Sequence, residues 1–175
     1  MITKKLISTF IAALIIFGCD DIEKMLKFNI NDKTAIRIES TSPFNLPIEI
    51  PTPDVTSNSQ QQYENNNTRA DLVQDVRLEQ LKLSISYPDA KTFSFLKSIR
   101  IFISSDQNNE IELAALENIA TGTNTIELIP TNQKLDAYTK ASSYNLRTEV
   151  TTRETLTESV DIQVDLKFLV TANAF

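Results

Sequence analysis

The stretch that decides the fold class reads Val160-Asp161-Ile162-Gln163-Val164-Asp165-Leu166-Lys167-Phe168-Leu169-Val170. Every second residue from Val160 to Val170 is apolar, and four of the five residues between them are polar. Successive side chains of a β-strand point to opposite faces, so this alternation gives a strand one buried and one solvated face. A helix would scatter the same apolar residues around its whole circumference. The sequence therefore predicts a half-buried strand over residues 160–170.

The same alternation recurs in four other segments, residues 44–50, 81–87, 99–103 and 144–150. Pro47 and Pro51 cannot donate a ladder hydrogen bond, so we expect the first of these strands at a sheet edge. The turn-forming residues 152–155 predict that 144–150 pairs antiparallel with the strand over 160–170. Shorter strands are predicted over residues 28–30, 34–39, 110–116 and 125–129.

Residues 69–77 depart from the alternation. Their apolar residues have helical spacing, and Thr68 with Asp71 resembles a capping box before them. We expect one short helix near residues 69–77 that leads into the strand over 81–87. The alternative is a single long strand with a bulge.

Residues 56–67 are strongly polar. They contain runs of glutamine and asparagine, one aromatic residue, Tyr63, and no aliphatic residue. Such a composition buries little apolar surface by itself. We therefore predict an exposed polar loop over 56–67, for which ligand binding is the alternative role.

The whole pattern of eight or nine short strands with little helix predicts an all-β fold, an antiparallel β-sandwich. We expect a single domain over residues 26–175. A transmembrane barrel fits less well, because no girdle pattern of aromatic residues accompanies Phe175. Gly122 lies in a turn-forming stretch, residues 120–124, and asparagines are expected to supply most of the other left-handed turn positions.

Part of the chain resembles uncharacterised lipoproteins of Bacteroidetes-type and related bacteria. The similarity lies in four segments, residues 93–104, 111–116, 135–138 and 164–170. The region that contains them covers roughly half of the chain. These segments are structural patterns rather than chemical motifs. The resemblance implies an immunoglobulin-like β-sandwich of unknown role.

The N-terminus has the order of an export signal. Lys4 and Lys5 precede a run of twelve mostly apolar residues, 6–17, which is shorter than the about 20 residues that a membrane-spanning helix needs. Residues 16–19, Ile-Phe-Gly-Cys, resemble a lipobox, in which cleavage occurs before the cysteine and the thiol carries lipid. We predict a lipoprotein signal peptide over 1–18 and lipidation of Cys19. The alternative is an ordinary secretory signal.

Residues 19–25 are predicted to form an acidic tether. In enteric bacteria, an aspartate directly after the lipidated cysteine resembles a mark for retention in the inner membrane. In Bacteroidetes-type bacteria, acidic residues such as Asp20 and Asp21 resemble a signal for export to the outer surface. The bias toward Asn, Lys, Ile and Thr favours the second group. We expect a lipid-anchored protein of the outer membrane, with exposure on the cell surface as the candidate orientation. The alternative is a solvated tether that carries no localisation signal.

The residue inventory excludes most enzyme classes. The chain has no histidine, and Cys19 is its only cysteine, so Ser/His/Asp and Cys/His arrangements are excluded. Two glycines cannot build a phosphate-binding loop. Removing Lys4 and Lys5 with the signal changes the net charge from −6 to −8, which disfavours nucleic acid as a partner. We predict no enzymatic activity and no cofactor.

Two groups of acidic residues remain as candidates. Asp161 and Asp165 share one strand face, as a carboxylate pair would, although Lys167 beside them is typical of a solvated face. Calcium could bind through oxygen-bearing segments, which are Asp20, Asp21 and Glu23, or Asp106, Asn108, Asn109 and Glu110. The second segment lacks the glycine and the length of an EF-hand loop, and its residue types favour turns. We predict no metal site.

Aromatic platforms for sugars are restricted to four tyrosines because the chain has no tryptophan; they are Tyr63, Tyr87, Tyr138 and Tyr144. We expect each in a sheet or at its rim, with its hydroxyl in water. Two functions stay open on sequence alone. The first is a lipid-anchored structural or interaction module, with the membrane and an envelope protein as partners. The second is a lipoprotein that binds carbohydrate or calcium.

Overall fold

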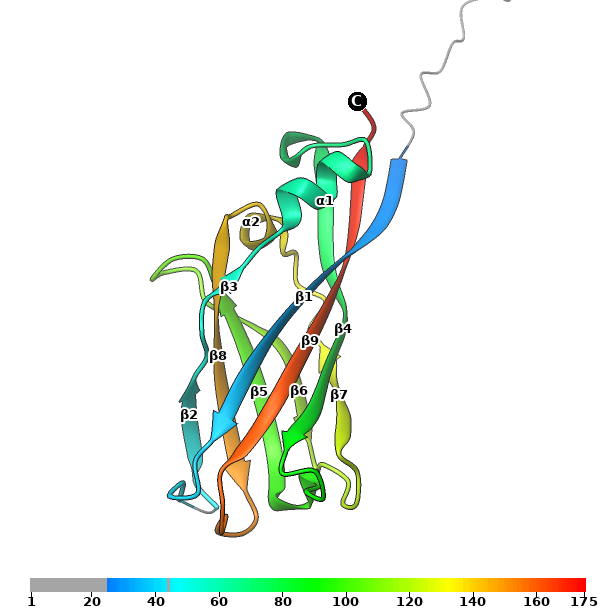
Figure 1. Ribbon diagram of the computed structural model, residues 1–175. Helices are drawn as coiled ribbons and strands as arrows, with labels where there is room; N and C mark the ends of the chain where they lie inside the picture. Colours follow the sequence, from blue (N-terminus) through cyan, green and yellow to red (C-terminus); the bar gives the residue numbers. More distant parts are fainter. Residues whose placement is uncertain (1–24, 44) are drawn as a thin grey trace, which may run out of the picture.

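The computed structural model describes residues 25–43 and 45–175 (Figure 1). The predicted signal peptide over 1–18, the lipidation site Cys19 and nearly all of the acidic tether over 19–25 lie outside these described residues. Within them, no helix is both long enough and apolar enough to cross a membrane.

The predicted strand over 160–170 is confirmed and forms the centre of one layer. It is β9 (Val160–Asn173), and alternate side chains from Val160 to Ala172 are buried. β9 pairs antiparallel with β1 (Met25–Ile38) on one side and with β4 (Val73–Tyr87) on the other. The alternation arises because one face of β9 packs on the core, as the sequence predicts.

The remaining strands extend the same antiparallel sheet. They are β7 (Thr125–Pro130), β6 (Ile111–Glu117), β5 (Leu96–Ser104), β8 (Ser143–Thr152), β2 (Pro47–Pro51) and β3 (Val55–Thr56). The strand order is β1-β9-β4-β7-β6-β5-β8-β2, and β3 also pairs with β8. The sheet curls so that β1, β9 and β4 lie over β8, β5 and β6 (Figure 1). The all-β, antiparallel prediction is confirmed.

The predicted hairpin between 144–150 and 160–170 is wrong. β8 pairs with β5, β2 and β3, whereas β9 pairs with β1 and β4 in the other layer. The connection over 153–159 is longer than most hairpin loops, and the Arg153 N–H donates to the Phe95 carbonyl at 2.7 Å as the chain leaves β8. Alternation within a strand does not show whether the next strand along the chain lies beside it in the same layer or across the core in the other layer. Because the last strand of an immunoglobulin sandwich lies beside the strand before it, the immunoglobulin-like order is not confirmed.

The core lies between the two layers. Its largest fully buried side chains include Phe93, Phe95 and Phe168, together with Tyr63 and Tyr144. Phe93 and Phe95 come from a single 3-10 turn, η2 (Phe93–Phe95), which leads directly into β5. Aliphatic side chains from every long strand fill the remaining space.

The short helix predicted near residues 69–77 is wrong in extent. Only η1 (Ala70–Leu72) is helical, and it is a single 3-10 turn before β4 begins at Val73. The pairing of β4 with β9 shifts register between Val73 and Asp75, within this segment, and again between Leu78 and Gln80. These two irregularities move the apolar residues out of strict alternation, so the spacing resembles that of a helix although the residues form a strand.

The prediction of an exposed loop throughout 56–67 is also wrong. The segment contains α1 (Ser59–Asn65), whose Tyr63 is 1% exposed. The Tyr63 ring packs edge-on against Phe28 of β1, and its hydroxyl donates to Oγ1 of Thr139, the last residue of α2 (Asp136–Thr139), at 3.2 Å. The Tyr63 side chain therefore holds this polar segment against the domain, because distant parts of the chain supply the apolar surface on which its ring packs.

The turn prediction is confirmed. The non-glycine residues with positive φ that the structure describes are all asparagines, Asn45, Asn67, Asn118 and Asn132. Gly122 has φ +85° in the connection from β6 to β7. Asparagine and glycine tolerate this left-handed region better than other residues.

Gly122→Ala is expected to lower the free energy of unfolding by about 1 kcal/mol. An added Cβ would meet nothing within 4 Å, so the whole cost comes from the backbone conformation. The matched variant, Gly122→Asn, should cost clearly less. Chemical denaturation of both variants measures the difference; equal losses would contradict a backbone origin.

Candidate functional site

The edge of the β8 layer is interrupted. β2 pairs with β8 from Pro47 opposite Thr151 to Pro51 opposite Arg147, which confirms the edge position that the prolines predict. β3 resumes the pairing with Val55 opposite Tyr144. Between the two ladders, residues 52–54 face residues 145–146 without strand pairing. Three residues against two make the edge strand bow away from β8.

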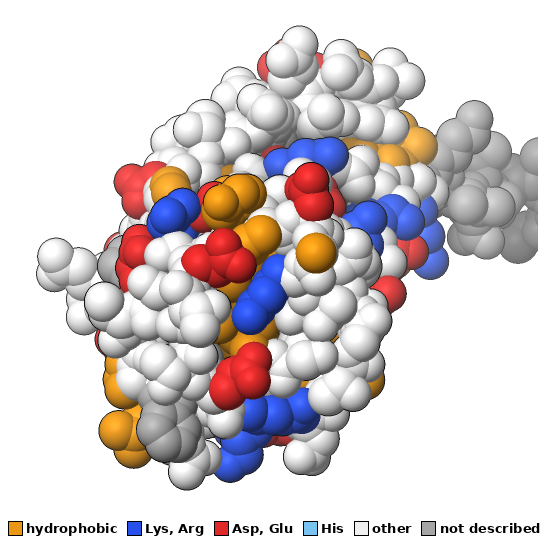
Figure 2. Space-filling model, turned by 60° about the horizontal axis from the view of Figure 1, so that its bottom comes forward, with side chains coloured by type: hydrophobic (Ala, Val, Ile, Leu, Met, Phe, Trp, Pro, Cys, Tyr) orange, Lys and Arg blue, Asp and Glu red, His pale blue; other side chains and the backbone are white. Residues whose placement is uncertain are grey.

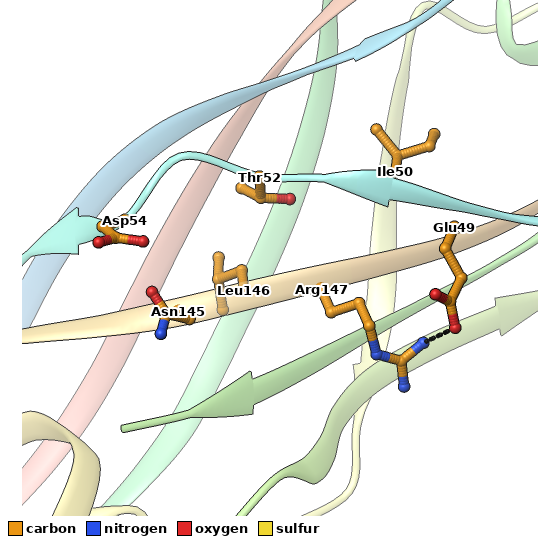
Figure 3. A pocket seen from close by; sticks show the side chains of 7 residues that line it. All are labelled: Glu49, Ile50, Thr52, Asp54, Asn145, Leu146 and Arg147. Carbon is orange, nitrogen blue, oxygen red and sulfur yellow. Dashed lines mark hydrogen bonds and ion pairs between the residues drawn. The ribbon is translucent and has the colours of Figure 1, made fainter. Parts of the chain in front are cut away.

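An open groove lies at this interruption. It has a volume of about 530 Å³, and its lining residues are Glu49, Ile50, Thr52, Asp54, Asn145, Leu146 and Arg147. Figure 3 shows these side chains on two neighbouring segments, the one from β2 to β3 and the facing part of β8. The volume falls within the range of small-ligand sites.

Arg147 organises the charged end of the groove. Its Nη1 lies 3.0 Å from Glu49 Oε1, and its Nη2 lies 2.8 Å from Glu110 Oε1. A further hydrogen bond joins Nε to Glu110 Oε2 at 3.0 Å. The guanidinium also stacks 4.0 Å from the ring centroid of Phe102 on β5. Arg147 is thus held from three sides, which fixes its position on the outer face of the sheet.

The electrostatics of this cluster favour binding over proton transfer. Hydrogen bonding to Arg147 lowers the pKa of Glu110, and hydrogen bonding to Glu110 raises the pKa of Arg147. Both groups therefore stay charged at neutral pH, whereas a general acid needs a pKa near the working pH. The other polar groups, Thr52, Asp54 and Asn145, offer donors and acceptors for a polar ligand.

A second hollow of about 310 Å³ lies on the other side of β2. It is lined by Arg37, Glu39, Thr41, Ser42, Pro43, Ile48, Glu49 and Ile50. Glu49 and Ile50 border both hollows, so β2 separates them. Arg37 is bound to Asp161 at 2.8 Å, and the Ser159 hydroxyl donates to Glu39, which lowers the pKa of Glu39. Figure 2 shows that acidic and basic side chains alternate along a band at this end, with hydrophobic side chains exposed between them.

The structure does not bring Asp161 and Asp165 into one site. Asp161 pairs with Arg37, and Asp165 lies 3.4 Å from Lys33 and 3.9 Å from Lys82. Four residues along a strand correspond to about 13 Å, farther than the 5–9.5 Å that separates paired carboxylates in glycosidases. The two carboxylates belong to separate ion pairs on the outer face.

In the loop over 105–110, side-chain oxygens accept hydrogen bonds from backbone N–H groups of the same loop. Asn109 Oδ1 accepts from the backbone N–H groups of Ser105 and Asp106, and Asp106 Oδ1 accepts from the N–H of Asn108. Glu110 is occupied by Arg147. Among the described residues, no three metal-ligating side chains of acid, cysteine or histidine type come together. The other candidate segment, with Asp20, Asp21 and Glu23, lies outside those residues.

The tyrosines are mostly not at the rim. Tyr63, Tyr138 and Tyr144 are buried, and their hydroxyls bind Thr139, the Asn109 carbonyl and Asp32, so the expectation that these hydroxyls lie in water is wrong. Tyr87 is 54% exposed at the far end of β4. Because their rings pack into the core, the three buried tyrosines cannot serve as sugar platforms.

One buried carboxylate lies outside the candidate sites that the sequence pattern indicates. Asp32 of β1 is 5% exposed and accepts a hydrogen bond from the Tyr144 hydroxyl at 2.8 Å. Burial raises the pKa of Asp32, and burial also raises the pKa of Tyr144. The sequence does indicate that Asp32 is buried, because Asp32 lies on the same face of the strand as the buried residues Ile30 and Ile36.

Taken together, the described chemistry consists of a solvent-open groove at a broken sheet edge and a buried Asp32–Tyr144 pair on the core side. The first offers hydrogen-bonding groups to a ligand or partner, and the second joins β1 to β8 through the interior. Compared with known proteins, the chain matches no family model and no curated protein.

Proposed function

We propose that this protein is a lipid-anchored envelope protein without catalytic activity, whose β-domain acts as a structural or protein-interaction module. The observation that carries the proposal is the order of the N-terminus. Two lysines, twelve mostly apolar residues and the Gly18-Cys19 pair are followed by a β-domain whose first strand begins at Met25. Cys19 is the residue that would carry the lipid, and the outer membrane is the proposed location.

The broken edge supports an interaction role. An edge strand presents unpaired backbone groups, and partner proteins commonly add a strand or insert side chains at such edges. Here β2 is short, bordered by prolines and flanked by two hollows. As for the fold, the two packed layers support placement in the broad sandwich class, and the position of β9 argues for a strand order different from the immunoglobulin one.

Cys19→Ser is expected to release the protein from membranes. The wild-type protein should partition into the detergent phase in a phase-separation assay, whereas the variant should be found in the aqueous phase or as uncleaved precursor. The matched control, Asp20→Ala with Asp21→Ala, retains the cysteine and should stay membrane-bound while losing accessibility to protease on intact cells. An uncleaved precursor keeps the apolar run 6–17, partitions with detergent like the wild type and is recognised by its larger mass. Detergent partitioning of a Cys19→Ser protein that has lost residues 1–18 would contradict the anchor.

The interaction role is tested by crosslinking in intact cells, followed by recovery of the lipidated protein from solubilised outer membranes. A stoichiometric partner is expected. Asn145→Arg places a large exposed side chain in the groove and should abolish the crosslink. Glu127→Arg, on exposed β7 away from the groove, is the control and should leave it intact. Recovery of the protein alone from the wild type would count against the proposal.

Carbohydrate binding is the second candidate, favoured by the polar lining of the groove. Carboxylate, amide and hydroxyl groups of Asp54, Asn145 and Thr52 are suited to sugar hydroxyls, and about 530 Å³ accommodates a short oligosaccharide. Calorimetric titration with a glycan panel should show heat that Asn145→Ala removes. Silence across the panel would contradict this candidate, and a calcium titration would test the acidic residues before Met25.

A further inference from the structure

One end of the domain gathers the beginning of β1, the end of β9 and α1 (Figure 1). Met25 lies opposite Asn173 in the β1–β9 ladder. Beyond β9, the Phe175 N–H donates to the Asn67 carbonyl at 3.2 Å, just after α1. Phe175 is therefore tied to the same end of the molecule as Met25.

This end exposes two large apolar side chains. Met25 is 60% exposed and Phe175 is 71% exposed, and they are among the most exposed large hydrophobic residues that the structure describes. The exposed residues of α1 and of the segment after it include four amides, Gln60, Gln61, Asn65 and Asn67, together with Glu64 and the ion pair between Arg69 and Asp71. A lysine, Lys27, is exposed on β1 and forms no ion pair with a described residue.

We propose that this end of the domain rests on the bilayer surface, with Met25 and Phe175 inserted among the lipid headgroups. The inference rests on the proposed anchor at Cys19. Scattered exposed apolar residues are ordinary on a protein surface; what distinguishes these two is their place relative to that anchor.

The length of the tether restricts the geometry. Five residues lie between Cys19 and Met25, so even a fully extended chain spans only about 20 Å from one to the other. By contrast, Asn173 and Asp161 are twelve residue steps apart on β9, which correspond to about 40 Å along the strand. A lipid on Cys19 therefore keeps the Met25 end near the membrane and leaves the end that carries Tyr87 far from it.

The side chains at this end suit an interface. Aromatic residues are favoured at the headgroup level, and flexible apolar side chains such as methionine adapt to irregular surroundings. Amide groups on α1 can hydrogen-bond to headgroup oxygens, and Lys27 can approach a lipid phosphate. The acyl chains on Cys19 supply the affinity, so the protein contacts need only orient the domain.

The chain contains no tryptophan, which makes a single-tryptophan test direct. We would prepare the lipidated full-length protein as Phe175→Trp, with Tyr87→Trp as the matched control, because both positions are exposed aromatic residues at opposite ends. Each is reconstituted into phosphatidylcholine vesicles with and without lipids brominated near the headgroup. Co-flotation with the vesicles shows separately whether the anchor holds.

The proposal predicts strong quenching and a blue shift for tryptophan at 175 and little change at 87. A third variant, Met25→Trp, should behave like Phe175→Trp. If the protein floats with the vesicles but position 175 is quenched no more than position 87, the orientation is wrong while the anchor stands. If the protein does not float, the anchor itself fails and the orientation fails with it.

Discussion

Phe168→Ala is expected to lower the free energy of unfolding by about 3–5 kcal/mol, the usual cost of removing a fully buried aromatic side chain. Phe168 is completely buried at the middle of β9, opposite Ile30 of β1 and Leu78 of β4. Its ring meets Tyr144 edge-on, with centroids 6.2 Å apart, and so joins the two layers. Urea denaturation followed by circular dichroism measures the loss.

The neighbouring residue supplies the control for this prediction. Lys167 lies on the other face of β9, where its side chain is 37% exposed and pairs with Glu79 at 3.0 Å. Exposed ion pairs contribute about 0–1 kcal/mol, so Lys167→Ala should change stability by no more than that. Similar losses for Phe168→Ala and Lys167→Ala would contradict the assignment of the two faces.

Tyr144→Phe is expected to destabilise the protein by about 1–3 kcal/mol, although it removes a single oxygen atom. The Tyr144 hydroxyl donates to Asp32 at 2.8 Å, and both residues are buried. Phenylalanine would keep the ring contact with Phe168 but leave the carboxyl group of Asp32 without this donor. Tyr87→Phe, at an exposed position, is the control and should be nearly neutral.

The same pair predicts a dependence of stability on pH. Burial raises the pKa of Asp32 above its ordinary value of 3.8, and hydrogen bonding to Tyr144 opposes this shift. Between 3.8 and the raised pKa, the folded protein holds a proton that the unfolded chain has lost. The contribution of Asp32 to stability therefore falls as the pH rises through this window.

Asp32→Asn removes that titration while keeping a side chain of similar size. The stability of Asp32→Asn relative to wild type should increase as the pH rises from about 4 toward 7. Denaturation curves at several pH values measure the difference. A constant difference across this range, or one that decreases, would contradict a raised pKa for Asp32.

Local alternation predicted the strands well where the pattern is unbroken, as in 99–103 and 160–170. It failed at β1, where residues 28–30 and 34–39 were expected as separate strands and the structure has one strand, Met25–Ile38. The polar residues around Asp32 interrupt the apolar pattern. The strand nevertheless continues through them, because the Tyr144 hydroxyl donates a hydrogen bond to the Asp32 carboxyl group in the interior. A contact between residues 112 positions apart cannot be found from local spacing.

The candidate groove was predictable only in part. Pro47 and Pro51 indicated an edge strand, and the edge is where the groove lies. Its charged end is assembled from Glu49, Glu110 and Arg147, which come from β2, the turn before β6, and β8. Their meeting depends on the order of the strands, and alternation within a strand carries no information about that order.

The measurement that tests the central claim most directly is mass spectrometry of the N-terminal peptide of the mature protein, extracted from membranes in detergent. The proposal predicts that residues 1–18 are absent and that Cys19 is the N-terminal residue, carrying acyl chains on its thiol. A mature N-terminus at any other residue, or an unmodified thiol on Cys19, would contradict it.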